Sequence, residues 1–317
     1  MKYRLNSSGT GYIVVDYGSC RDKTVVLPSQ YKNLPVTEIG ESAFSNCSFL
    51  ESITIPDSVT SIGYRAFYYC ENLTSIKIPN SVTNMGNSAF YYCRNLTSVT
   101  IGNSVTSIGD WAFQQCYNLT SVTIGNSVTS IGDFAFYSCT NLTSITIPDS
   151  VTSIGNVAFK NCSNLTSVTI GNSVTRIRSS AFGNCTNLTS ITIPDSVTSI
   201  DVGTFSECSN LTSVTIGNNV TIIDSKAFWK CEKLKSITIP DSVTSIGTEA
   251  FSGCKNLTSV TIGNSVTSIA PYAFQSCTNL TSITFKGTKA EWNAIKAAGS
   301  WFLGNVTIYC TDGEMTN

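Results

Sequence analysis

Apolar residues recur along this chain in a fixed order, separated by runs of Thr, Ser and Asn. Within residues 104–126, Leu119, Val122 and Ile124 form the pattern L-x-x-V-x-I, in which the last two alternate with polar residues. This alternation within a β-branched run predicts a short strand with one buried face. Gly125 and Asn126 follow and supply the turn chemistry that ends such a strand.

A second group of apolar residues follows each predicted strand. Val128 and Ile131 form a short pair, and Ala135-Phe136 and Cys139 come next. The Phe and the Cys are the most uniform positions of this unit, and eleven cysteines recur at a constant interval of 23 residues. They are Cys47, Cys70, Cys93, Cys116, Cys139, Cys162, Cys185, Cys208, Cys231, Cys254 and Cys277, and the matching phenylalanines are Phe44, Phe67, Phe90, Phe113, Phe136, Phe159, Phe182, Phe205, Phe228, Phe251 and Phe274.

A single 23-residue unit is too small to bury its own apolar side chains. Stacking equivalent strands about 4.8 Å apart turns each apolar position into a continuous column, so the repeat predicts a solenoid. Each stacked Phe would contribute roughly 1.5–3 kcal/mol by burial. We expect an N-terminal cap and irregular first unit at residues 1–34, eleven repeats at 35–285 and a C-terminal cap at 286–317.

Both ends of the chain carry cap signals. Residues 3–5 and 12–15 predict a hairpin that turns at Ser7-Ser8-Gly9. Near the other end, Thr288 and Glu291 match a helix capping box. Trp292 and Ile295 would share one face of that helix, which we expect to cover the last unit and to stop at Gly299.

The unit L-x-x-V-x-I-[PG]-x-x-V-x-x-I-G-x-x-A-F-x-x-C-x-N closely resembles the BspA-like leucine-rich repeat family, which occurs in surface proteins of anaerobic and gut-dwelling bacteria and of parasitic protists. The resemblance covers Pro35 to about Phe285. It implies an α/β or mainly β fold, a right-handed leucine-rich-repeat solenoid with a parallel concave sheet. It also implies an extracellular or cell-surface protein that binds host or neighbouring-cell macromolecules.

Composition excludes several classes of function. The 317 residues hold 19 Lys+Arg against 20 Asp+Glu, so neither a nucleic-acid surface nor a polybasic membrane arm is expected. Because there is no histidine, every His-dependent triad, base or metal site is excluded. No apolar stretch approaches 18 residues, and the first residues lack the apolar core of a signal peptide. We expect no enzyme activity, no cofactor and no membrane insertion.

The cysteines predict a structural column. They lack the close pairs that zinc sites need. A ladder of disulfides is possible by distance, but in-register side chains run parallel, which favours buried free thiols. Cys20 and Cys310 fall at opposite ends and cannot pair. The Gly after the second Ile is replaced by Arg178, Asp201, Asp224 and Ala270, so we interpret it as a preference for a tight turn.

Asn recurs at the entry to the predicted strands. Nine Asn-Leu-Thr triplets are formal glycosylation sequons. Their regular spacing has a structural explanation, because an Asn side chain at this turn can satisfy backbone groups in one unit after another.

Differences between repeats point to a binding surface. Exposed aromatic residues offer large contact area at low entropic cost, and eight of them gather in the second to fifth repeats. They could instead fold over neighbouring repeats and cover them. The candidates are Tyr68, Tyr69, Tyr91, Tyr92, Trp111, Tyr117, Phe134 and Tyr137.

The outward strand positions form a monotonous hydroxyl array. It could bind a ligand through many weak hydrogen bonds, or it could consist of β-favouring surface residues. An ice-binding surface is a remote alternative, since a curved sheet matches a planar lattice poorly. The clearest members are Thr97, Ser98, Thr100, Thr120, Ser121 and Thr123.

One arrangement suggests catalysis. Asp110 and Asp133 are equivalent in adjacent repeats, so their carboxylates could lie about 5 Å apart, as in retaining glycosidases. Asp is common in such turns and no pocket is implied there, which favours a structural role. We therefore predict a monomeric, non-catalytic recognition protein for a protein or glycan ligand, or alternatively a structural spacer that holds other modules away from a cell surface.

Overall fold

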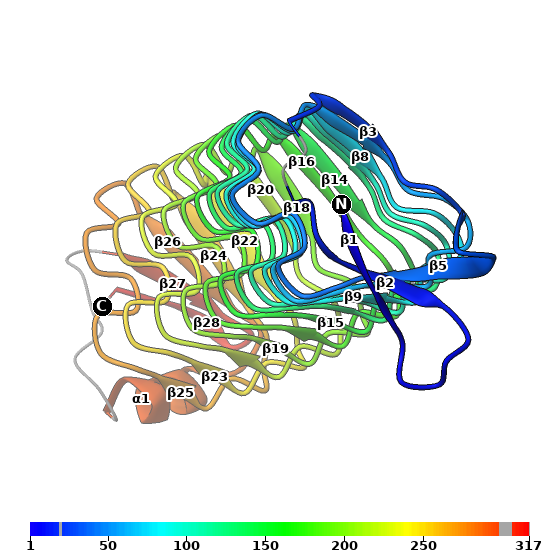
Figure 1. Cartoon of the computed structure of the whole chain (residues 1–317). Coiled ribbons are helices and arrows are strands. Elements are labelled where there is room, and N and C mark those ends of the chain that lie inside the picture. Colours follow the sequence, from blue (N-terminus) through cyan, green and yellow to red (C-terminus); the bar gives the residue numbers. More distant parts are fainter. Residues whose placement is uncertain (19–20, 298–305, 317) are drawn as a thin grey trace. The chain divides into compact units, whose positions relative to one another are not determined.

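The computed structural model describes residues 1–18, 21–297 and 306–316, and the predictions for Cys20 and Gly299 lie outside these residues. The chain forms two compact units, Met1–Ser163 and Asn164–Asn317. Each unit is a β-solenoid in which one winding corresponds to one 23-residue repeat (Figure 1). The predicted parallel-strand solenoid is therefore confirmed.

Two ladders of strands run through unit 1, on different sides of its windings (Figure 1). Equivalent residues pair in parallel, as Val99 does with Val122 and Ile108 with Ile131. The longer strands are β3 (Thr24–Val26), β6 (Ser52–Thr54), β8 (Ser75–Lys77), β10 (Ser98–Thr100), β12 (Ser121–Thr123) and β14 (Ser144–Ile147). The shorter strands are β7 (Ser61–Ile62), β9 (Asn84–Met85), β11 (Ser107–Ile108), β13 (Ser130–Ile131) and β15 (Ser153–Ile154).

Unit 2 repeats the same arrangement. Ile237 pairs with Val260 and then Ile283, again at intervals of one winding. The longer strands are β16 (Ser167–Ile170), β18 (Ser190–Thr192), β20 (Ser213–Thr215), β22 (Ser236–Ile239), β24 (Ser259–Ile262) and β26 (Ser282–Phe285). The shorter strands are β17 (Arg176–Ile177), β19 (Ser199–Ile200), β21 (Ile222–Ile223), β23 (Ser245–Ile246) and β25 (Ser268–Ile269).

The Phe column forms the spine of each unit. In unit 1, from Phe44 to Phe159, successive ring centroids lie 5.0 to 5.3 Å apart with planes within 10° of parallel. In unit 2, from Phe182 to Phe274, the spacing is 5.3 to 5.7 Å. These rings are buried, so the predicted stacking of equivalent side chains is confirmed within each unit.

The cysteines of the repeats are buried free thiols. The thiol of Cys116, for example, donates to the carbonyl oxygen of Phe90 in the preceding winding, with Sγ 3.3 Å from the oxygen. Eight further column cysteines make the equivalent bond at 3.0 to 3.3 Å. The thiols therefore tie windings together in addition to filling space.

Asn side chains at the strand entry also connect windings. The amide of Asn95 donates to Asn72 Oδ1 at 3.1 Å, and Asn118 donates to Asn95 at 3.2 Å. Asn210 and Asn187 repeat this contact in unit 2. The sequence predicts that these amides bond backbone groups; in the structure they mainly bond one another, because equivalent side chains lie one strand spacing apart.

Each winding holds two residues in the left-handed region, at the position before Ala and at the second position after Phe. In the fourth winding these are Trp111 and Gln115, with φ of 56° and 60°. Their N–H groups point along the stack and donate to Asp133 and Tyr137 of the next winding. Bonds of this kind offset the strain of about 1–2 kcal/mol per left-handed residue.

The Gly after the second Ile has a different role from the one predicted. Gly109 does not adopt a positive φ; a Cβ atom there would lie 2.6 Å from Asn87 Oδ1 of the preceding winding. At Gly132, a Cβ atom would meet Asp110 Oδ1 at 2.5 Å. The interpretation as a tight-turn residue is therefore wrong, and close approach of neighbouring windings explains the preference.

The N-terminal end matches the predicted hairpin. Strands β1 (Lys2–Leu5) and β2 (Tyr12–Asp16) pair antiparallel, and β2 then pairs in parallel with β5 (Leu34–Ile39). Strand β4 (Gln30–Tyr31) joins the edge of β5, and the Tyr31 ring stacks on Tyr3 with centroids 4.2 Å apart.

The C-terminal end matches the predicted helix, α1 (Lys289–Ala297). Thr288 and Glu291 form a reciprocal capping box: Glu291 Oε2 accepts from the Thr288 N–H at 2.7 Å, and Thr288 Oγ1 accepts from the Glu291 N–H at 3.3 Å. Trp292 is fully buried and its ring lies 5.3 Å from Phe285. Strands β27 (Thr307–Cys310) and β28 (Gly313–Thr316) then extend the sheet of β26.

Candidate functional site

The predicted aromatic residues lie in the irregular part of the unit 1 windings, on either side of the Phe column: Trp111 and Phe134 come before the column Phe, and the tyrosines come after it. Tyr69, Tyr92, Trp111 and Phe134 occupy left-handed positions, with φ between 56° and 62°. Such positions turn a side chain away from the core while the backbone stays bonded to the next winding. The repeat therefore fixes the backbone and leaves these side chains free to vary.

Five of the aromatic residues form one contiguous group, the tyrosine cluster (Tyr68, Tyr69, Tyr91, Tyr92 and Tyr117). Equivalent rings stack: the centroids of Tyr68 and Tyr91 lie 5.0 Å apart with planes 18° from parallel. Tyr69 and Tyr92 lie 4.4 Å apart, and Tyr117 meets Tyr92 edge-on at 6.0 Å. All five are half-buried, so they both cover neighbouring windings and present a surface.

Two arginines border the tyrosine cluster. The Arg65 guanidinium lies 4.8 Å from the ring centroids of both Tyr64 and Tyr68. Arg94 lies 4.1 Å from the ring centroid of Tyr92 and donates to its hydroxyl oxygen. Neither arginine was among the residues predicted from the sequence, nor was Tyr64, which is 40% exposed. Their positions in the repeat could have identified them, because Arg65 occupies the same variable position of its winding as Trp111.

The other predicted aromatic residues form a second, smaller group. The rings of Trp111 and Phe134 stack with centroids 6.2 Å apart, and Tyr137 meets Phe134 edge-on at 5.8 Å. Trp111 is 40% exposed. Among the described residues no ring contact joins this group to the tyrosine cluster, because Gln114 and Gln115 fill the intervening positions.

Two phenols of the tyrosine cluster have a raised pKa and are neutral at pH 7. Partial burial raises the pKa of Tyr69 and of Tyr91, and the neighbouring tyrosines add to the effect. A neutral phenol both donates and accepts a hydrogen bond. The cluster therefore offers polar contacts at the rim of an aromatic surface.

The hydroxyl array is divided between two roles. Thr97 Oγ1 donates to the Thr74 carbonyl at 2.9 Å, and Thr120 Oγ1 donates to the Thr97 carbonyl at 3.0 Å. These hydroxyl protons hold windings together. Thr100 and Thr123 instead are exposed on β10 and β12, as is Ser121, while Ser98 is half-buried. The sheet that carries them ends after β12, so the array is not continuous.

The two candidate carboxylates serve the turn. Asp110 Oδ1 accepts from the Asp133 N–H at 2.8 Å, and Asp133 Oδ1 accepts from the Asn156 N–H at 2.7 Å. Asn87 holds the Asp110 N–H in the same way. In this ladder each side-chain oxygen accepts from a backbone N–H of the next winding, which is the structural role that the sequence favoured for Asp in these turns.

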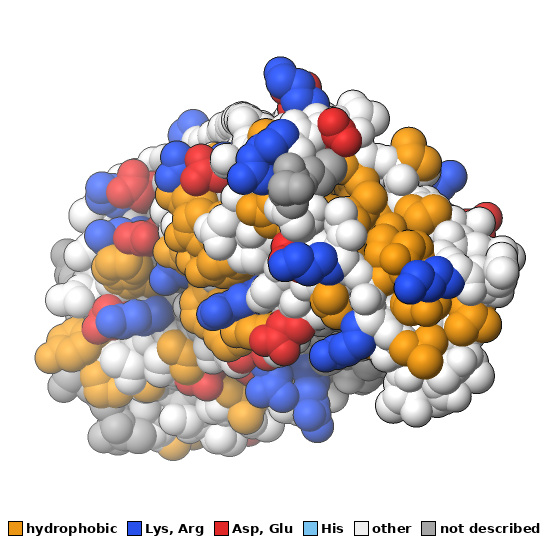
Figure 2. All heavy atoms as spheres, viewed as in Figure 1, with side chains coloured by type: hydrophobic (Ala, Val, Ile, Leu, Met, Phe, Trp, Pro, Cys, Tyr) orange, Lys and Arg blue, Asp and Glu red, His pale blue; other side chains and the backbone are white. Residues whose placement is uncertain are grey.

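Charge and metal-binding groups are sparse. Figure 2 shows acidic and basic side chains scattered over one face among polar and hydrophobic ones. No three His, Cys, Asp or Glu residues of the described ranges cluster as they would around a metal ion. Nor does any helix in that part of the chain have the length and apolarity to cross a bilayer.

Comparisons with known proteins agree with the architecture. The chain is 32% identical to a leucine-rich cell surface protein from Faecalibacterium prausnitzii, over 95% of this chain and 96% of that one, with a TM-score of 0.48. It is 26% identical to a leucine-rich repeat protein from Bacteroides ovatus, over 98% and 97%, with a TM-score of 0.63. The pneumococcal vaccine antigen PcpA shares the fold at 19% identity, over 91% and 86%, with a TM-score of 0.50.

No curated protein matches the chain. The profile of the BspA type leucine rich repeat region, in contrast, matches six copies over residues 18–142, 129–231 and 204–298. These ranges cover most of both units and the two ladders of strands described above. The chain therefore belongs to the BspA-type leucine-rich repeat family.

Proposed function

We propose that this chain is a non-catalytic recognition module that binds a protein or glycan partner through the tyrosine cluster, Trp111 and Phe134. One observation carries the proposal: aromatic side chains gather on variable positions of an otherwise uniform scaffold. The bordering Arg65 and Arg94 add charge to that surface.

The geometry suits binding because the rings are already ordered. Stacking between Tyr68 and Tyr91 and between Trp111 and Phe134 fixes their side chains before a partner arrives. Immobilising a free side chain on association costs about 0.5–1.5 kcal/mol, so ordered rings reduce that cost. Tyr, Trp and Arg are also the residues that most often dominate binding energy at interfaces.

An adhesin-like role at a cell surface or outside the cell fits the family resemblance. A protein or glycan of a host or neighbouring cell would then be the partner, and the chain would act as a monomer. Absence of histidine and the use of Asp110 and Asp133 in the turn ladder support a role without catalysis.

The test compares partner capture by three proteins. The unmodified chain, a Tyr68→Ser/Tyr91→Ser/Trp111→Ser variant and a Tyr272→Ser control are screened against immobilised matrix proteins, mucins and glycans. Tyr272 is the matched control, because it is exposed, left-handed and equivalent to Trp111 but lies in unit 2. We expect the triple variant to lose capture at least about tenfold, a change of 1.4 kcal/mol.

The control should bind as the unmodified chain does, and unfolding transitions should show that all three proteins are folded. Equal capture by the triple variant would refute the aromatic surface. If the unmodified chain captured no ligand, the alternative of a structural spacer would replace recognition.

A further inference from the structure

The ladder of longer strands is interrupted in a regular way. It is broken between β6 and β8, between β12 and β14, between β16 and β18, and between β20 and β22. In each case the second strand belongs to a winding whose strand is followed by proline. These prolines are Pro79, Pro148, Pro194 and Pro240. Pro56 is different, because its strand β6 pairs with β3 of the irregular first winding.

Proline removes one hydrogen bond that a closed ladder can make. In the run β22–β24–β26 the residue at this position donates its N–H to the preceding winding: Gly263 donates to the Ile239 carbonyl at 3.0 Å, and Lys286 donates to Ile262 at 2.9 Å. Proline has no N–H to donate.

The closed position is also tight where glycine occupies it. A Cβ atom on Gly125 would lie 2.3 Å from the Gly102 carbonyl oxygen, and one on Gly217 would lie 2.5 Å from the Pro194 oxygen. The windings with these four prolines do not pair with the winding before them, whereas the windings with glycine, and the winding with Lys286, do pair.

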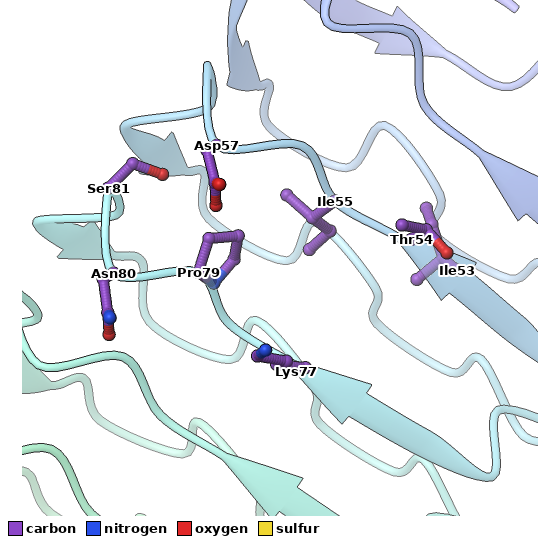
Figure 3. Close-up of a pocket in the computed structure, with 8 residues that line it drawn as sticks. All are labelled: Ile53, Thr54, Ile55, Asp57, Lys77, Pro79, Asn80 and Ser81. Carbon is purple, nitrogen blue, oxygen red and sulfur yellow. The ribbon is translucent and has the colours of Figure 1, made fainter.

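Three of the four interruptions are open clefts. Cavities of about 520, 470 and 360 Å³ lie at Pro79, Pro240 and Pro148 respectively. The equivalent isoleucines at the end of the L-x-x-V-x-I segment before each interruption, Ile55, Ile124, Ile170 and Ile216, are 7 to 9% exposed. Their equivalents in unbroken parts of the ladder are at most 2% exposed. Figure 3 shows the first cleft, in which Pro79 faces Ile55 of the preceding winding and Lys77 lies at its edge.

The clefts present unpaired backbone groups beside apolar surfaces. In the closed ladder the Ile101 N–H donates to the Thr123 carbonyl at 2.9 Å. The corresponding groups across two clefts, Ile124 with Thr146 and Ile216 with Thr238, make no such bond among the described residues. An occupant must therefore offer donors and acceptors together, as a hydroxyl group does.

The clefts at Pro148 and Pro240 favour a neutral ligand, whereas Asp57 and Lys77 both line the cleft at Pro79. The cleft at Pro148 contains no charged side chain; Thr123, Asn126 and Thr146 form its polar rim, and Val122 and Ile124 its apolar part. In the cleft at Pro240, the two charged residues neutralise each other, since Lys286 Nζ lies 3.1 Å from Asp241 Oδ1. Anionic and cationic ligands gain nothing from such sites.

The width excludes an added strand. A peptide strand between two others needs them roughly 9.6 Å apart. Cα atoms of β12 and β14, and likewise of β20 and β22, lie within 8 Å of each other. A sugar ring at the mouth of the cleft has no such requirement, because its hydroxyl groups reach inward while its C–H face packs on the proline ring.

We propose that the proline clefts bind a neutral linear polysaccharide. In unit 2 the interruptions at Pro194 and Pro240 are two windings apart, or about 10 Å at the ordinary strand spacing. This is close to the length of two linked hexoses, so a chain of β-1,4-linked sugars places every second ring over a cleft. The site is independent of the tyrosine cluster and of the function proposed for it.

The test closes the clefts of unit 2. In a Pro194→Gly/Pro240→Gly variant both windings carry the residue that their neighbours already have, so the fold is kept and β20 can pair with β22. Hydrogen exchange should show this directly, as slower exchange of the Ile216 N–H. Binding of cellohexaose, measured by calorimetric titration, should weaken at least about tenfold relative to the unmodified chain.

The Tyr68→Ser/Tyr91→Ser/Trp111→Ser variant serves as the second comparison. It should bind cellohexaose as the unmodified chain does, which separates this proposal from the aromatic surface. The proposal is overturned if neither cellohexaose nor mannohexaose binds the unmodified chain, or if the variant with slowed Ile216 exchange binds the sugar unchanged. It is also overturned if an extended peptide binds to the clefts and no sugar does.

Discussion

The buried thiols should make this protein sensitive to alkaline pH. Burial raises the pKa of Cys162 and of Cys208 from the ordinary value of 9.0 to about 12. Burial also raises the pKa of the Cys93, Cys139 and Cys231 thiols. In the unfolded chain these groups return to their ordinary values. The unfolded state therefore loses its protons first as the pH rises.

The direction and size of the effect follow from linkage. Because the folded pKa lies above the unfolded one, each thiol contributes its full stabilisation below pH 9 and loses it as the pH rises toward 12. At pH 10 an unfolded thiol is mostly ionised and a folded Cys162 is not. The free energy of unfolding then falls by about 1.4 kcal/mol for this one thiol.

The measurement is urea unfolding at pH 7 and pH 10, for the unmodified chain and for Cys162→Ala. Truncation itself lowers stability at both pH values, so only the change with pH is compared. The variant should lose about 1.4 kcal/mol less than the unmodified chain over this interval. Leu165→Ala is the control, a buried residue without a proton to lose, and it should show the full loss. Identical pH dependence in Cys162→Ala and the unmodified chain would refute the reasoning.

Three further substitutions test the packing and the cap by urea unfolding. Phe136→Ala removes a fully buried ring from the column and should cost about 3–5 kcal/mol, and a cost no larger than that of Phe134→Ala at the half-buried position would contradict the role of the column. Gly125→Ala places a Cβ atom 2.3 Å from a backbone oxygen and should lower the free energy of unfolding by about 1–3 kcal/mol. Gly183→Ala is the control and should be tolerated, because its Cβ atom would meet only a Ser hydroxyl at 3.2 Å. Equal effects of the two substitutions would count against the close approach of windings at Gly125. Thr288→Ala removes the N-terminal cap of α1 and should cost about 1 kcal/mol, and an unchanged midpoint would show that the cap does not stabilise the C-terminal end.

The sequence predicted the repeating part of the fold well because one pattern is tested many times. A single L-x-x-V-x-I run is ambiguous, but equivalent Phe and Cys residues every 23 positions permit only a stacked arrangement. The capping box at Thr288 was equally readable, since its chemistry is local. Hydrogen bonds from the thiols to the Phe carbonyls could not be predicted, because they depend on the rotation of each side chain.

The candidate site was predicted less completely. The eight aromatic residues stand out when equivalent positions of successive repeats are compared. Arg65 and Arg94 pack on the same rings, but they were left out because only aromatic residues were considered. Gln114 divides the surface in two, which a count of aromatic residues per repeat does not reveal. The clefts were missed for a related reason: Pro and Gly share one position of the repeat pattern, but the ladder is open at Pro79, Pro148, Pro194 and Pro240 and closed where Gly stands.

The alternation of Pro and Gly also sets the smallest segment that can be deleted or duplicated without changing the order of open and closed windings. From residue 120 to residue 263 two kinds of winding alternate. One has Val in its longer strand and Gly after it, and the other has Ile in its longer strand and Pro after it, so the full sequence period there is 46 residues. Deleting one winding would bring two windings of the same kind together and would alter the number of openings. Deletion or duplication in pairs preserves their order, so viable length variants of this region should differ by even numbers of windings.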